Sequence, residues 1–114
     1  MTRISTHVLD TALGKPAAGV AVRLERQDNS GEWRFVSSAR TDDDGRTGEL
    51  FAGTAALPHV AYRLTFDVAA YHAAQRVDGL FPVIYVAFLV REGEAHFHIP
   101  LLLSPNGYTA YRGS

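Results

Sequence analysis

Two histidines near the end of the chain, His96 and His98, are the residues best suited to chemistry, because an imidazole pKa of about 6.5 allows proton transfer near neutral pH. They lie in an alternating segment, residues 95–103. The alternate apolar positions of this segment are Phe97, Ile99, Leu101 and Leu103. Burial of each of these side chains contributes ~1.5–3 kcal/mol, so this set is predicted to face the core. Successive side chains of a strand point to opposite faces, so the histidines are predicted to face outward.

Pro100 shares the outward face with the histidines and removes a backbone donor from a strand that its apolar set places well inside the structure. Such a local conflict is expected at functional sites. Three interpretations of the histidines stay open at this point: an ordinary solvated surface, a metal site of His96-x-His98 with His7, and acid–base catalysis. The metal interpretation lacks a cysteine and a carboxylate at a matching spacing.

Period-two alternation also predicts the elements that position these residues, most clearly over residues 60–68. Turn-forming residues 28–31 indicate a hairpin, and alanine-rich residues 69–75 indicate one short helix. The predicted strands cover 4–10, 20–27, 32–41, 48–51, 60–68, 83–91, 95–103 and 107–112. About eight short, closely spaced strands favour an all-β, two-sheet sandwich. Neither a repeat nor a linker divides the chain, so residues 1–114 are expected to form a single domain.

Composition excludes several classes of partner. The chain has 114 residues, 11 basic and 12 acidic, with a net charge of −1 and no basic block, so no nucleic-acid partner is expected. The longest apolar run, residues 83–90, is far shorter than the roughly 20 residues that span a bilayer, so no membrane partner is expected. There is no cysteine, and the N-terminus lacks the apolar segment of a secretory signal. A cytoplasmic protein is therefore expected.

Three stretches of the sequence carry a more specific signal. They are His7-Val8-Leu9-Asp10 with Gly14-Lys15-Pro16-Ala17-Ala18-Gly19-Val20, then Gly45-Arg46-Thr47-Gly48, and finally His96-Phe97-His98-Ile99-Pro100-Leu101-Leu102-Leu103-Ser104-Pro105-Asn106-Gly107-Tyr108 with Tyr111-Arg112-Gly113-Ser114. In this order they closely resemble the 5-hydroxyisourate hydrolase family, the transthyretin-like proteins of urate breakdown. The glycine–proline segment looks like a feature of many prealbumin-like modules. The histidine pair and the Tyr-Arg-Gly-Ser ending look like the enzyme branch and not like the vertebrate hormone carrier.

The resemblance implies a transthyretin-like (prealbumin) sandwich that forms a homotetramer, with pairs of subunits facing each other across a channel. Pro100 and Leu102 would then face this channel, with His96 at its mouth. The implied reaction is hydrolysis of 5-hydroxyisourate to 2-oxo-4-hydroxy-4-carboxy-5-ureidoimidazoline in purine catabolism, without a cofactor or a metal. His59 and His72 have no such context and are expected at the surface.

The active-site set that the resemblance implies consists of four catalytic residues and one further substrate-binding residue. The catalytic residues are His7, Arg46, His98 and Ser114, and Tyr111 joins them in binding substrate. His98 is assigned as the base, Arg46 as the clamp for substrate and oxyanion, and His7 as orienter or proton donor, with the reverse division of the two histidines left open. The Ser114 hydroxyl or terminal carboxylate would complete the site.

Each of these residues also has a purely structural interpretation. His7 is then a half-buried strand histidine, Arg46 pairs with Asp42, Asp43 or Asp44, and the Tyr111 ring caps the core. The alternative for the whole protein is a transthyretin-like carrier that holds a flat small molecule in the intersubunit channel without turnover. A structural or adhesion sandwich module is a more distant alternative. The sequence leaves open the rate, the stereochemical course and the enzyme that oxidises urate.

Overall fold

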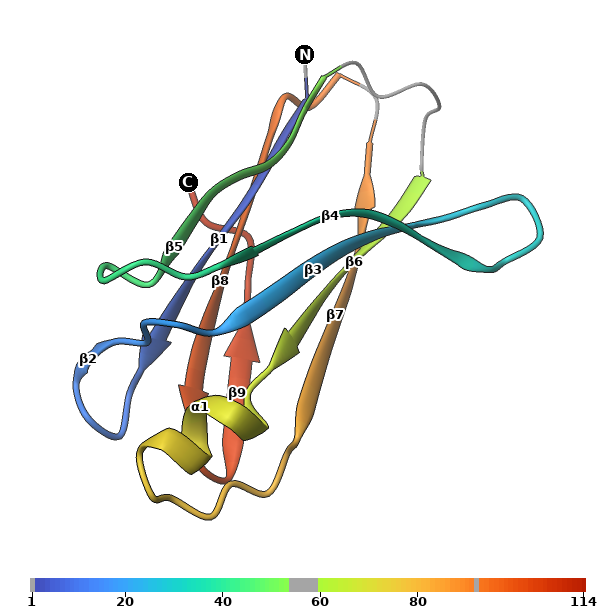
Figure 1. Ribbon diagram of the computed structural model, residues 1–114. Coiled ribbons are helices and arrows are strands. Elements are labelled where there is room, and N and C mark those ends of the chain that lie inside the picture. Colours follow the sequence, from blue (N-terminus) through green and yellow to red (C-terminus); the bar gives the residue numbers. More distant parts are fainter. Residues whose placement is uncertain (1, 54–59, 92) are drawn as a thin grey trace.

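The computed structural model describes residues 2–53, 60–91 and 93–114, which form nine strands and one helix (Figure 1). The elements in chain order are β1 (Thr2–Asp10), β2 (Lys15–Pro16), β3 (Ala21–Gln27), β4 (Trp33–Arg40), β5 (Arg46–Gly53), β6 (Val60–Asp67), α1 (Ala69–Ala74), β7 (Val83–Val90), β8 (His96–Ser104) and β9 (Gly107–Ala110). The all-β prediction with one short helix is confirmed. Only the two-residue strand β2 has no counterpart among the predicted strands.

The strands form two sheets. One has the order β2-β1-β8-β9, with β5 pairing with β1 as well, and the other has the order β4-β3-β6-β7. The predicted hairpin around residues 28–31 joins β3 to β4 as antiparallel neighbours. In the first sheet β1 and β8 run parallel, so the first strand lies beside a strand from the last part of the chain (Figure 1). This pairing places the histidines of β1 and β8 in one sheet.

The hydrophobic core lies between the two sheets and follows the alternation of the strands. From β8 it takes Phe97, Ile99, Leu101 and Leu103, which are 2%, 5%, 0% and 1% exposed, respectively. From the opposite sheet it takes residues such as Leu24, Leu64 and Phe66, each fully buried. The predicted inward face of residues 95–103 is therefore confirmed, and the other face of β8 is turned away from the core.

Strand β5 begins at Arg46, two residues earlier than predicted, and its pairing with β1 has two irregularities that the sequence pattern does not indicate. The one nearer Arg46 is a bulge that matters for the site. Ser5 pairs with Glu49, but His7 pairs with Arg46, so β5 has one residue more than β1 between these pairs. Gly48 lies in this insertion with φ of +70°, a left-handed conformation that glycine adopts at little cost. In a regular ladder Thr47 would oppose His7, so the bulge is what puts Arg46 on the same face as His7.

The prediction that His72 lies at the surface is wrong, since the residue is only 4% exposed. Its ring packs edge-on against Tyr71 with centroids 5.6 Å apart. On another side it is covered by Gly79, where an added Cβ atom would lie 2.5 Å from the His72 ring. The loop after α1 thus folds back over the helix, a contact that helix periodicity does not reveal. His59 lies outside the described residues.

Candidate active site

The outward face of the β2-β1-β8-β9 sheet collects the predicted polar residues through two cross-strand pairs. Ser5 on β1 is the Cα partner of His98 on β8, and His7 on β1 is the Cα partner of Arg46 on β5. Directly opposed residues of neighbouring strands point to the same face of a sheet. Three strands that are distant in sequence therefore present His7, Arg46 and His98 on one surface.

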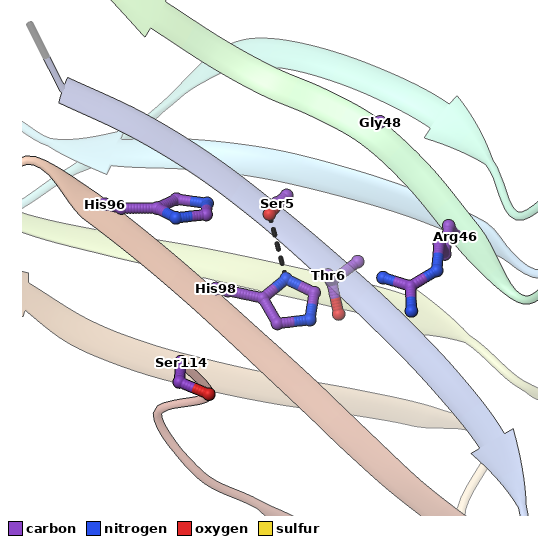
Figure 2. A pocket seen from close by; sticks show the side chains of 7 residues that line it. All are labelled: Ser5, Thr6, Arg46, Gly48, His96, His98 and Ser114. Carbon is purple, nitrogen blue, oxygen red and sulfur yellow. Dashed lines mark hydrogen bonds between the residues drawn. The ribbon is translucent and has the colours of Figure 1, made fainter.

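A pocket of about 190 Å³ opens on this surface. Its lining residues are Ser5, Thr6, Arg46, Gly48, His96, His98 and Ser114 (Figure 2). Figure 2 shows the Arg46 guanidinium and the His98 ring extending from separate strands toward the same space, with Ser114 on the far side of His98. The structure thus brings together three of the predicted catalytic residues: Arg46, His98 and Ser114.

The His98 imidazole is oriented by Ser5. The Ser5 hydroxyl lies 2.9 Å from Nδ1, and this hydrogen bond leaves Nε2 turned toward the side on which Arg46 lies (Figure 2). Partial burial lowers the pKa of His98 below its usual 6.5, and the positive charges of Arg46, His7 and His96 lower it further. His98 is therefore held in its neutral form near pH 7, the form that accepts a proton.

His7 is fixed in a different way. Its Nε2–H donates to the carbonyl oxygen of Asp44 at 2.7 Å, and because a carbonyl only accepts, this nitrogen must carry a proton. The ring centroid lies 6.5 Å from that of His98. His7 is not among the residues that line the pocket, so it stands beside His98 rather than in direct contact with the pocket space.

The alternative interpretation of Arg46, an ion pair with the neighbouring aspartates, has no support in the described part of the chain. There the Asp42 carboxylate accepts the backbone N–H groups of Asp44 and Arg46, at 2.9 and 3.0 Å. The ion pairs found among the described residues do not include the Arg46 guanidinium. Its charge is thus directed to the pocket, where a planar fork of donors suits oxygen atoms of a bound molecule.

Residues Tyr111–Ser114, called the tail below, run along the edge of β8 beyond the end of β9. The carbonyl of His98 accepts the Gly113 N–H at 2.7 Å, and the carbonyl of Pro100 accepts the Tyr111 N–H at 3.4 Å. Pro100 has no backbone N–H, and its nitrogen faces this edge, just past the last β8–β9 ladder pair. No ladder hydrogen bond is lost there, so a proline is tolerated. This route brings Ser114 to the pocket.

The tail also changes two expectations. Pro100 is buried within the chain itself, with Gly113 packed against its ring, so it is not an open apolar position facing a channel. Leu102, the next residue on that face, is partly exposed as expected. Tyr111 is 50% exposed and is not among the residues that line the pocket, so its ring does not cap the core.

Three lining residues are absent from the predicted set: Ser5, Thr6 and Gly48. Alternation alone places Ser5 on the face of His7, but its contact with His98 depends on the parallel pairing of β1 with β8, for which the local pattern has no signal. Thr6 belongs to the other face, and its hydroxyl donates to the Ile99 carbonyl at 2.6 Å. His96, expected at the mouth of a channel, is exposed and lines the pocket, with its ring centroid 6.2 Å from that of His98.

Among the described residues, no three His, Cys, Asp or Glu side chains are grouped so that they could hold a metal ion. In the same part of the chain, no helix has the length and apolar character needed to cross a membrane.

Comparison with known proteins places this geometry in a family. The family model described as HIUase/Transthyretin matches residues 4–113. The chain is 42% identical over 111 residues to a 5-hydroxyisourate hydrolase of Salmonella dublin, covering 97% of this chain and 80% of that protein. It is also 42% identical over 118 residues to a 5-hydroxyisourate hydrolase of Caulobacter vibrioides, covering the whole of both chains.

Solved structures agree with the sequence relatives. The 5-hydroxyisourate hydrolase of Klebsiella pneumoniae superimposes with a TM-score of 0.85 at 35% identity, over all of both chains. Transthyretin from Sparus aurata superimposes with a TM-score of 0.88 at 31% identity, over 96% of this chain and 95% of that one. The fold is therefore the transthyretin-like sandwich, and the chain belongs to the HIUase/Transthyretin family.

Proposed function

We propose that this protein is a hydrolase that opens the six-membered ring of 5-hydroxyisourate in urate degradation. The observation that carries the proposal is the single pocket in which a neutral, oriented imidazole (His98), a guanidinium without an ion-pair partner among the described residues (Arg46) and the tail residue Ser114 meet. The 5-hydroxyisourate hydrolases to which the chain is similar support the same activity.

In the proposed first step, water adds to the carbonyl carbon of the cyclic amide. Nε2 of His98 takes a proton from the water as its oxygen forms the new bond to carbon, and the carbonyl electron pair moves onto oxygen. Arg46 donates to this oxyanion and stays charged throughout, which stabilises charge as it develops in the transition state. Ser5 holds the other nitrogen of His98 and so keeps Nε2 directed to the pocket.

In the second step the bond from that carbon to the ring nitrogen breaks, and the carbon–oxygen double bond forms again. The electron pair of the broken bond stays on the departing nitrogen, which receives a proton from the His7–His98 pair. The proton removed from water is thus returned, and no cofactor is required. Within the pair we assign His98 as base, because it lines the pocket and His7 does not, and His7 as orienter or proton donor. Ser114 completes the substrate site in this proposal, and Tyr111 contributes as the first residue of the tail that carries Ser114 there.

We further propose that residues 1–114 act as one domain, that four copies assemble into a homotetramer, and that the protein works in the cytoplasm. The partly exposed Leu102 beside His98 fits a face that a second subunit covers. Such a cover would exclude water from the pocket opening and strengthen the electrostatic contacts inside it.

The direct test generates 5-hydroxyisourate from urate with a uricase and follows the decay of its absorbance. Wild-type protein should accelerate this decay well beyond the spontaneous rate, and His98→Asn should reduce the acceleration about 10²–10⁴-fold, the usual range for loss of a general base. Decay at the spontaneous rate with the wild-type protein, combined with binding of a urate analogue, would instead identify a carrier. A near wild-type rate in His98→Asn would remove the proposed base from the mechanism.

A further inference from the structure

The turn between β7 and β8 contains a carboxylate, Glu94, that lies between two arginines from different parts of the chain. Arg91 binds it through Nε at 2.6 Å to one oxygen and through a terminal nitrogen at 3.3 Å to the other. Arg112, in the tail, approaches the same carboxylate at 2.5 Å. One acidic side chain therefore joins the turn to the tail, and Arg91 fixes its orientation.

The Arg112 guanidinium has two other partners besides Glu94. Its second terminal nitrogen donates to the backbone carbonyl of His96 at 2.8 Å. Its central carbon lies 4.5 Å from the centroid of the Phe97 ring, within the range of a cation–π contact. These contacts determine both the position and the tilt of the guanidinium plane at the start of β8.

The next two residues connect this anchor to the pocket. Immediately after Arg112, the Gly113 N–H donates to the His98 carbonyl at 2.7 Å. Ser114 follows and lines the pocket beside His98. The position of Ser114 thus depends on one backbone hydrogen bond, from Gly113, and on the contacts that hold Arg112.

We infer that Glu94 is a positioning residue for the proposed hydrolysis: its carboxylate seats the tail so that Ser114 completes the pocket, although Glu94 itself is not among the residues that line it. This inference rests on the proposed function. An isolated exposed ion pair contributes little to stability. A carboxylate that binds two arginines, one of them through both of its oxygens, forms a charge network, and such networks contribute more to stability. Side-chain exposures of 31% for Glu94 and 39% for Arg112 indicate that the pair is partly screened from water.

The test compares Glu94→Gln with wild type in two measurements. The first measurement is steady-state kinetics of 5-hydroxyisourate hydrolysis. If substrate binds only to the form in which the tail is in place, saturating substrate restores that form, so kcat should stay near the wild-type value. KM should rise between about 3- and 30-fold, in proportion to the lost population of seated tail. General damage to the protein would give the opposite pattern, a lower kcat at unchanged KM.

The second measurement is hydrogen exchange of the Gly113 amide, which needs no activity. Exchange should accelerate in Glu94→Gln, while amides of the core strands in the same sample keep their wild-type rates. Glu32→Gln is the matched control, because Glu32 pairs with Arg34 in an exposed hairpin at 2.9 Å and touches neither the tail nor the pocket. Arg112→Gln should have effects at least as large as those of Glu94→Gln, because it also removes the contacts with the His96 carbonyl and the Phe97 ring. The double variant should add little to Arg112→Gln, since both changes break the same ion pair.

The outcomes separate the inference from the proposed function. If KM and Gly113 exchange in Glu94→Gln both stay within twofold of wild type, the anchor does not exist. A fall in kcat with unchanged Gly113 exchange overturns it as well. If Gly113 exchange accelerates but the wild-type protein has no hydrolase activity, the anchor stands and the proposed function fails.

Discussion

Replacement of Gly113 by alanine tests how closely the tail must approach His98. A Cβ atom at this position would lie 2.9 Å from Cδ2 of His98 and 3.1 and 3.2 Å from two carbons of the Pro100 ring. Neither neighbour is the free end of a flexible side chain, because Ser5 holds His98 and Pro100 belongs to a central strand. The tail is therefore the part that must move.

The size of the effect follows from what this movement breaks. It stretches the 2.7 Å hydrogen bond from the Gly113 N–H to the His98 carbonyl, a type of bond worth ~1 kcal/mol net. Crowding of a packed contact adds a further penalty of ~1–3 kcal/mol. Together they disfavour the seated tail by about 2–4 kcal/mol, which corresponds to roughly a 30- to 700-fold loss of kcat/KM.

The assay is the decay of freshly generated 5-hydroxyisourate at several substrate concentrations. Gly107→Ala is the control, because Gly107 has no left-handed backbone conformation and a Cβ atom there would find its nearest neighbour, Ser104 Oγ, at 3.7 Å. The control should keep its kcat/KM within about twofold, as is usual for a change that disturbs no special feature. A Gly113→Ala variant that retains more than half of the wild-type kcat/KM would show that the tail does not need this close approach.

Three further predictions concern the same face. First, kcat/KM should rise with pH along a limb centred below 6.5, because burial and the charge of Arg46 lower the pKa of His98 and only its neutral form takes a proton; a pH profile centred above 6.5 would contradict this. Second, Gly48→Ala should lower the free energy of unfolding by about 1–2 kcal/mol through its φ of +70°, and an unchanged urea midpoint would show that the bulge tolerates a side chain. Third, a tag fused after Ser114 should reduce turnover more than a tag at the N-terminus, and equal turnover by both forms would remove the tail from the mechanism.

Local sequence patterns were sufficient for the parts of the fold that depend on neighbouring residues. Alternation in β8 predicted which of its side chains enter the core, because successive residues of any strand must point to opposite faces. It also predicted that His98 faces away from that core. The resemblance to a known family added the set of residues to be tested together, with Arg46 and Ser114 among them.

The sequence pattern did not predict the contacts made between distant segments. Ser5 and His98 are 93 residues apart, and their hydrogen bond exists only because β1 and β8 pair in parallel with a particular register. The side of the sheet on which Arg46 lies depends on the extra residue of β5 between Arg46 and Glu49. Period-two alternation alone would place Arg46 on the opposite face. The burial of His72 and of Pro100 likewise comes from segments that fold over them, the loop at Gly79 and the tail.

By itself, then, the sequence determined the class of fold, the inward and outward sets of each strong strand and the residue types available for proton transfer. The tertiary structure decided which of these residues meet. The physical reason is that side-chain alternation is a property of each strand alone, whereas register, bulges and the path of the tail arise from pairing between segments far apart in the chain. For this protein, the neutral His98, the directed Arg46 and the seated Ser114 all depend on that pairing.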